Sequence, residues 1–140
     1  MTHRTTLNAV TVIAALLATF HLSDDIVRGF EPGGPEMYTG MLIVTVWLYA
    51  GLVLADRRWG LLLLLFMSIG GLAVPYLHMR NGLAGGRIAN TSGMFFWVST
   101  LLGLGVTSMF SIALTVRELW TYSSRSATTG STNVARRAGT

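Results

Sequence analysis

Four long stretches with few charged side chains constrain this chain more than any other feature of its sequence. They cover about residues 7–27, 37–55, 61–79 and 94–116. An apolar stretch of about 20 residues can cross a bilayer as an α-helix that makes every backbone hydrogen bond within itself. Charged residues form 11% of the chain, whereas about 25% is usual in a soluble domain. The sequence therefore predicts an all-α integral membrane protein with four transmembrane helices.

Short connections join the four stretches. The segments EPGGP (31–35) and DRRWG (56–60) have the length and composition of turns. The longest connection, RNGLAGGRIANTSG (80–93), contains four glycines. Connections this short make consecutive helices antiparallel neighbours. We therefore expect residues 1–122 to form one up-down-up-down antiparallel four-helix bundle.

The distribution of arginine predicts how this bundle is oriented. Seven arginines fall on the side of the two termini, and three fall on the other side. The first group is Arg4, Arg57, Arg58, Arg117, Arg125, Arg136 and Arg137, and the second is Arg28, Arg80 and Arg87. Positive residues concentrate on the cytoplasmic side, so we expect both termini in the cytoplasm and the protein in the plasma (inner) membrane. The Ser/Thr-rich segment 123–140 is predicted to be a disordered cytoplasmic tail.

Composition also limits the class of function. Cysteine is absent, which excludes disulfides, thiolate metal ligands and cysteine nucleophiles. The net charge is +4, but no nucleic-acid-binding motif accompanies it, so we expect no nucleic-acid partner. No nucleophile lies beside a base at a suitable spacing, so an enzyme is not the expected class. The expected partners are the lipid bilayer, other membrane subunits or further copies of the chain.

A polar group lies at the non-cytoplasmic end of the first stretch, in the sequence HLSDDIVRG (21–29). Helical spacing places His21, Asp25 and Arg28 on one stripe, with Asp24 beside it. His78 lies at the corresponding end of the third stretch. We therefore expect these five side chains to lie at similar depth, and charged residues at such positions are candidates for function.

One interpretation of this cluster is structural. Asp24 and Asp25 bracket Arg28 on the helical wheel, and Arg80 and Arg87 would join from the long loop. The first histidine would be hydrogen-bonded inside the network, since charges near the bilayer usually have partners. This interpretation predicts a non-enzymatic membrane subunit or partner-binding protein with an outward-facing polar cluster.

Two other interpretations involve a cofactor. His21 with Asp24 or Asp25 has the spacing of two ligands on one helical face, and His78 would add a third ligand to a divalent metal. Alternatively, His21 and His78 would be the two axial ligands of a haem b used in redox or ion handling. A proton or ion pathway through the aspartates is less well supported, because the opposite halves of the helices hold no acid.

The fourth stretch carries small or hydroxylated residues at steps of four. They are Ser99, Gly103, Thr107, Ser111 and Thr115. Small residues allow membrane helices to approach closely, so we expect this stripe to be a packing seam. A polar path is the alternative, but the stripe contains nothing ionisable.

Overall fold

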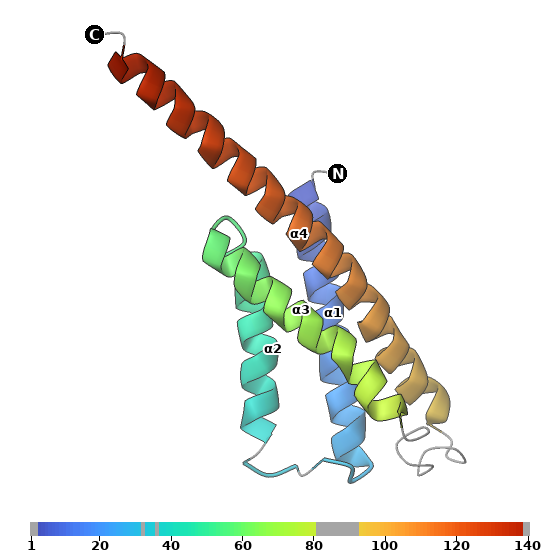
Figure 1. Cartoon of the computed structure of the whole chain (residues 1–140). Coiled ribbons are helices and arrows are strands. Elements are labelled where there is room, and N and C mark those ends of the chain that lie inside the picture. The colour runs from blue at the N-terminus through green and yellow to red at the C-terminus, as the bar shows by residue number, and fades with distance from the viewer. Residues whose placement is uncertain (1–2, 32, 36, 81–92, 139–140) are drawn as a thin grey trace.

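The computed structural model describes residues 3–31, 33–35, 37–80 and 93–138, with side chains described as far as residue 124. The elements in these ranges are four helices (Figure 1), which confirms the prediction of an all-helical fold. They are α1 (His3–Val27), α2 (Met37–Leu52), α3 (Arg58–Met79) and α4 (Met94–Ala138).

The helices pack in a ring in which each one packs mainly against two neighbours. α1 and α3 each pack against both α2 and α4. The connection from α1 to α2, the last turn of α3 and the first turn of α4 lie together at one end of the molecule (Figure 1). We call this the histidine end, because His21 and His78 lie toward it. The N-terminus and the turn from α2 to α3 lie toward the opposite end (Figure 1).

Three of the helices are long and apolar enough to cross a membrane. They are α1, α3 and the part of α4 up to Ser124. α2 is an apolar helix of 16 residues that ends at Leu52, three residues before the predicted limit. At the following turn, the N–H groups of Val53 and Leu54 both donate to the carbonyl of Tyr49. Gly60 lies so close to the carbonyl of Leu54 that a Cβ atom there would overlap it, so the hairpin requires glycine.

α4 is longer than predicted, because its backbone stays helical to Ala138 and extends past the other three helices (Figure 1). We predicted disorder from residue 123 onward. A helix makes its backbone hydrogen bonds internally, so such an extension satisfies its polar groups without a core. The division of the chain at residue 122 into a packed part and a tail stays a prediction.

A Schellman motif ends α1 directly after the polar group. Gly29 has a positive φ of 71°, which glycine adopts without a steric penalty. Its N–H donates to the carbonyl of Ile26, and the N–H of Phe30 donates to the carbonyl of Asp25, at 3.0 and 2.8 Å. These are the two bonds of the motif. The turn folds Phe30 back against the buried cluster of Trp97 and Leu101.

The packed face of α4 differs from the predicted seam. Ser99 is exposed, whereas Ser111 and Thr115 are buried. The face that is buried contains Trp97, Thr100, Leu101, Leu104, Ser108, Ser111 and Thr115. In a helix with 3.6 residues per turn, residues four apart differ in direction by about 40°. A stripe of five such residues therefore turns away from the interface. The hydroxyls of Ser68 and Ser111 share a hydrogen bond of 2.7 Å across α3 and α4.

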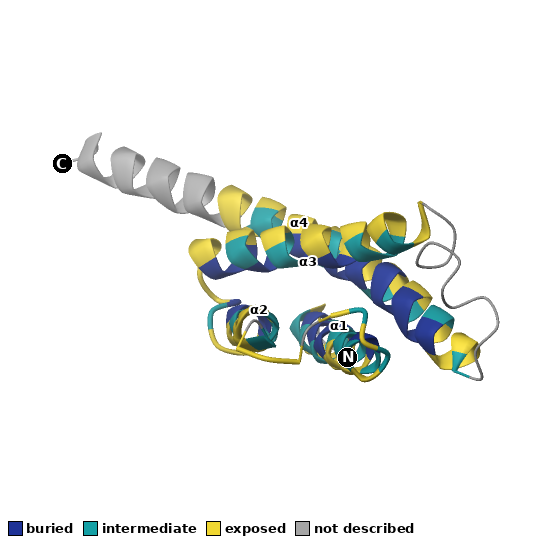
Figure 2. Ribbon diagram, turned by 90° about the horizontal axis from the view of Figure 1, so that it is seen from below, coloured by how far each residue is buried: buried dark blue, intermediate teal, exposed yellow. Residues whose placement is uncertain are grey.

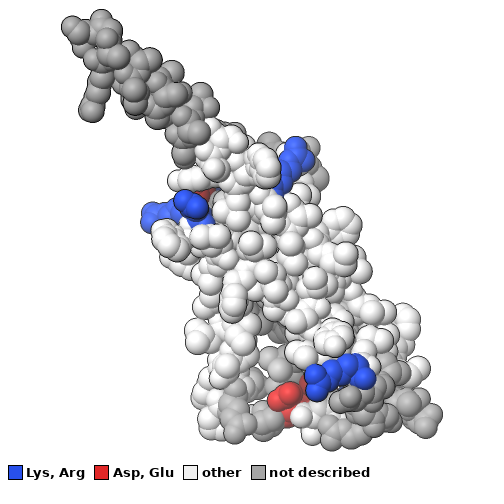
Figure 3. All heavy atoms as spheres, in the orientation of Figure 1, with Lys and Arg blue, Asp and Glu red and all other residues white. Residues whose placement is uncertain are grey.

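The outer surface of the bundle is strongly apolar. Buried residues form the inner faces of the helices, and exposed residues cover their outer sides (Figure 2). Large exposed side chains include Phe66, Tyr76, Phe95, Met109 and Phe110. Figure 3 shows charged side chains near the two ends of this face and uncharged side chains between them. A soluble protein rarely exposes a continuous apolar surface of this kind.

Candidate metal centre

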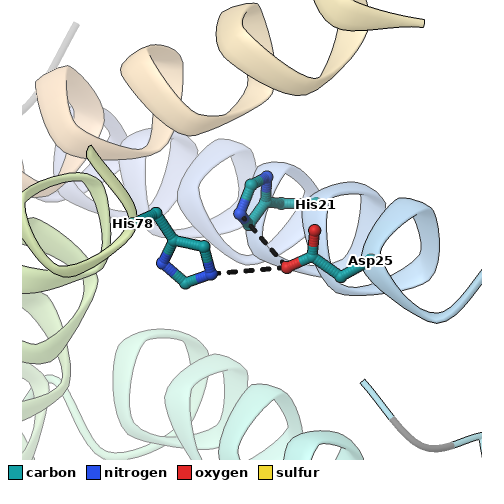
Figure 4. Close-up of side chains that lie close together, drawn as sticks. All are labelled: His21, Asp25 and His78. Carbon is teal, nitrogen blue, oxygen red and sulfur yellow. Dashed lines mark ion pairs between the residues drawn. The ribbon is translucent and has the colours of Figure 1, made fainter. Parts of the chain in front are cut away.

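Three side chains that can bind metals meet at the histidine end (Figure 4). His21 and Asp25 lie one turn apart on α1, and His78 reaches them from the last turn of α3. Oδ2 of Asp25 lies 3.5 Å from Nε2 of His21 and 3.4 Å from Nε2 of His78. One ligand atom from each residue lies within 4.8 Å of the other two. The structure therefore brings together three of the four ligands that the sequence predicted.

The carboxylate of Asp25 is oriented by α4. Nε1 of Trp97 donates to Oδ1 of Asp25 at 2.6 Å. This short bond engages Oδ1, so the other carboxylate oxygen, Oδ2, is the one that faces both imidazoles. Both residues are buried, at 0% exposure for Trp97 and 3% for Asp25. Trp97 therefore fixes the orientation of this carboxylate.

The outer nitrogens of both imidazoles also face hydrogen-bond acceptors. Nδ1 of His78 lies 3.0 Å from the carbonyl of Val74, which can only accept a proton. Nδ1 of His21 lies 3.4 Å from the hydroxyl oxygen of Thr100. That hydroxyl donates its own proton to the carbonyl of Phe96 at 2.9 Å, so its oxygen can accept one from His21. We assign the Nδ1–H tautomer to both rings on this pattern of partners.

In this tautomer, three lone pairs point toward one place. A neutral imidazole that carries its proton on Nδ1 has a lone pair on Nε2. Nε2 of His21 is buried and has no hydrogen-bond partner in the described structure. Together with Nε2 of His78 and Oδ2 of Asp25 it forms a set of acceptors without a donor. Such a set needs either a proton or a metal ion among its atoms.

Two of the three separations match those in a four-coordinate metal site, and the two histidine nitrogens lie within 4.8 Å of each other. Zinc binds histidine nitrogen and carboxylate oxygen at about 2.0–2.2 Å, so neighbouring ligands of a tetrahedron lie about 3.3–3.6 Å apart. The two nitrogen–oxygen distances, 3.4 and 3.5 Å, already have this length. The side chain of His78 is 31% exposed, whereas that of His21 is 4% exposed. The site is thus buried on the α1 side and reachable beside His78.

Asp24 is separated from this group. Its Oδ2 accepts a hydrogen bond of 2.7 Å from Nε of Arg28, one turn further along α1. The partners of the Asp25 carboxylate are instead His21, His78 and Trp97. The predicted pairing of Arg28 with Asp24 is thus present, and the sharing of Arg28 between both aspartates stays a prediction. Adjacent residues point about 100° apart on a helix, so the two carboxylates face different neighbours.

Of the two loop arginines in the predicted network, only Arg80 is described by the structure. Within the described ranges, Arg80 makes no ion pair with either aspartate. Arg87 lies outside the described residues. A second ion pair joins Arg4 to Asp56 at the opposite end, between the start of α1 and the turn before α3. The cluster is thus an ion pair, Asp24–Arg28, beside a separate His–Asp–His group.

The geometry does not fit a haem between the two histidines. A bis-histidine haem requires the imidazoles on opposite faces of a flat macrocycle. The rings of His21 and His78 contact each other edge to face, with centroids 5.1 Å apart. The indole of Trp97 packs against both, at 5.1 and 5.9 Å. The space that a macrocycle would need is therefore filled by side chains.

The Asp24–Arg28 pair leads to a stability prediction. Both side chains are mostly buried, at 15% and 16% exposure. Removing one partner from a pair of intermediate burial costs less than the full buried penalty, so we expect Arg28→Ala to destabilise the fold by about 1–3 kcal/mol. Asp24→Asn in the same chain should restore part of this loss, because it removes the unpaired charge. Thermal unfolding in detergent measures both effects, and rescue by Asp25→Asn instead would contradict the assigned pairing.

Two residues of the site were not predicted from the sequence. Trp97 and Thr100 lie on α4, far along the chain from the residues that they orient. A buried tryptophan needs an acceptor for its N–H, which is a general signal that Trp97 has a polar partner. The identity of that partner depends on how α4 is rotated against α1.

Comparisons with known proteins do not identify this group of residues. No protein-family model, no curated protein and no solved structure matches the chain. The function proposed below therefore rests on the geometry of His21, Asp25 and His78 and on the chemistry of their side chains.

Proposed function

We propose that this chain is a four-span membrane protein that binds a divalent metal ion, with zinc the best fit, through His21, Asp25 and His78. The observation that carries the proposal is the convergence of three acceptor atoms, one from each residue. The protein also hydrogen-bonds the far side of these groups, for example through the carbonyl of Val74 and the indole N–H of Trp97. Metal-binding histidines typically donate their other ring N–H to a carbonyl or carboxylate, and metal-binding carboxylates are themselves hydrogen-bonded.

Zinc is favoured by the ligand types and by their number. Two imidazoles and one carboxylate suit zinc, whereas calcium and magnesium prefer six or more oxygen ligands. Three protein ligands also leave one tetrahedral position open, as in zinc sites that bind water or a substrate. The charge of Arg28 is balanced by Asp24 at 2.7 Å, which reduces its repulsion of a bound cation.

The membrane location is supported by length, apolarity and exposure. Three helices are long and apolar enough to span a bilayer. The 16 residues of α2 extend for about 24 Å, slightly less than the hydrocarbon core of about 30 Å. Large apolar side chains cover the outside of the bundle, where they would contact lipid. We propose an up-down-up-down bundle in the plasma (inner) membrane, with the metal centre near its non-cytoplasmic surface.

Arginine and tryptophan residues support a proposed orientation. Arg57, Arg58 and Arg117 lie toward the end opposite the metal centre. Trp59 and Trp120 are 81% and 76% exposed, as expected of side chains that anchor a helix at the membrane surface. We propose that this end and both termini face the cytoplasm.

A fusion experiment tests this orientation. A reporter that is active only outside the cytoplasm, fused after Trp120, is expected to be inactive. The same reporter inserted after Gly33, in the connection from α1 to α2, is expected to be active. Opposite activities at the two positions would reverse the proposed orientation, and equal activities would contradict the proposed number of spans.

Metal analysis tests the proposed function. The full chain, purified in detergent, stripped with a chelator and dialysed against Zn²⁺, is expected to retain about one ion per chain. Replacement by Co²⁺ should give the intense visible absorption of a tetrahedral site, which reports geometry independently of stoichiometry. If the chain holds no metal after dialysis against Zn²⁺, the metal proposal fails. The histidines then act as protonated partners of Asp25, and the structural interpretation holds.

A further inference from the structure

We propose that the open position of this metal centre binds the carboxylate of a single-chain lipid, whose hydrocarbon chain lies in an apolar crevice below it. This inference rests on the proposed metal site and specifies its ligand. Three observations support it: the crevice is lined by apolar side chains, it begins one helical turn from both histidines, and the charge of the loaded site favours an anion.

The crevice lies among all four helices and has a volume of about 310 Å³. This volume is in the range of pockets that hold small ligands. Its walls include Ala18 from α1, Trp47 from α2, Phe66, Gly70 and Val74 from α3, and Leu104 from α4. Its extent along α3, from Phe66 to Val74, corresponds to about 12 Å of helix. These dimensions suit a stretch of hydrocarbon chain, and the apolar walls exclude a polar ligand.

The crevice ends close to the metal centre on two helices. Ala18 precedes His21 by one turn of α1, and Val74 precedes His78 by one turn of α3. The carbonyl of Val74 accepts the hydrogen bond from Nδ1 of His78, so one residue contributes to both features. A chain in the crevice would therefore place its polar head close to His78, the more exposed of the two histidines.

Charge and coordination determine the kind of head group. A divalent ion bound by two neutral imidazoles and one carboxylate keeps a net positive charge, which an anionic ligand neutralises. Zinc accepts carboxylate oxygen as a ligand. The simplest lipid with one chain and one carboxylate is a fatty acid, and we take this class as the occupant.

Gly70 provides a direct way to fill the crevice. A Cβ atom at Gly70 would meet nothing within 4 Å, so Gly70→Leu places a side chain in open space without displacing the packing. Ala73→Leu is the matched control, because Ala73 is exposed on the same helix. Both variants introduce leucine, at positions three residues apart. A fatty acid partitions into the bilayer equally in both samples, so a difference between the variants reports the crevice.

The experiment uses the full chain loaded with Co²⁺ in nanodiscs of phosphatidylcholine. Dodecanoate, octanoate and acetate are titrated while the visible Co²⁺ spectrum is recorded. We expect each carboxylate to change the spectrum, with half-saturation at least about tenfold lower for dodecanoate than for acetate and octanoate in between, because buried methylenes add affinity. Gly70→Leu is expected to lose most of this preference for long chains, whereas Ala73→Leu keeps it.

The outcomes separate the two proposals. Absence of a Co²⁺ spectrum overturns the metal site and, with it, the lipid ligand. A Co²⁺ spectrum that no carboxylate changes, or one for which Gly70→Leu and Ala73→Leu show the same chain-length preference, overturns only the lipid ligand. The chain-length series in the unaltered protein is a second test that does not depend on either variant.

Discussion

His78→Ala is expected to abolish stoichiometric zinc binding and to lower the zinc affinity by more than about hundredfold. Removing an outer hydrogen-bond partner of a metal ligand costs about 10–100-fold, and loss of the ligand itself should cost more. His78 is the best ligand to replace, because its side chain is 31% exposed and its loss disturbs the core less than loss of His21. Competition with a chromophoric chelator measures the affinity, and the Co²⁺ spectrum reports the geometry.

The control for this substitution is Asp24→Asn. It removes a negative charge beside the site, but its carboxylate pairs with Arg28 and lies outside the His–Asp–His group. We expect its zinc affinity to stay within a few-fold of the original, whereas Asp25→Asn should behave like His78→Ala. Similar losses in the Asp24 and Asp25 variants would indicate that the acids act only through general charge, and would remove the basis for the assigned ligands.

A milder version of the same experiment concerns Trp97. Trp97→Phe keeps an aromatic ring but removes the N–H that donates to Oδ1 of Asp25 at 2.6 Å. We expect the zinc affinity to fall about 10–100-fold, with one ion still bound at saturation. Binding should weaken as the pH falls in both proteins, because protons compete with the metal for the imidazoles. An unchanged affinity would show that Trp97 only fills space.

Gly71→Leu is expected to destabilise the fold strongly. A Cβ atom at Gly71 would overlap the indole of Trp47 and lie 2.5 Å from the hydroxyl oxygen of Ser108. Both neighbours are buried, at 3% and 0% exposure, so neither can move aside easily. Overpacking a close-packed interior typically costs about 1–3 kcal/mol. Thermal unfolding in detergent should show a clear decrease in the melting temperature.

The adjacent glycine is the control. Gly70→Leu adds the same side chain one residue away, where the structure has open space. It is expected to leave the melting temperature nearly unchanged, since helical propensity improves and no packed atom moves. Equal effects at the two positions would mean that α3 is rotated relative to the described packing. Gly103→Leu should be intermediate, because its Cβ would meet the flexible end of Leu17 at 3.2 Å.

Features within one helix followed directly from the sequence. The four apolar stretches correspond to the four helices, because the length of an apolar segment is a local property. The pairing of His21 with Asp25 follows from a spacing of four, which places both on one face at any helix position. The same periodicity leaves both aspartates within reach of Arg28, and the contacts that distinguish Asp25 come from other helices.

Relations between helices were decided only by the tertiary structure. The sequence placed His78 at the depth of His21, but its contact with Asp25 depends on the rotation of α3 against α1. The role of Trp97 depends in the same way on α4, as does the packed face that replaces the predicted seam. Apolar side chains surround these helices, so hydrophobic periodicity does not mark the inward face as it does in a soluble bundle. Close packing at positions such as Gly71 sets those rotations, and these determine which polar side chains meet.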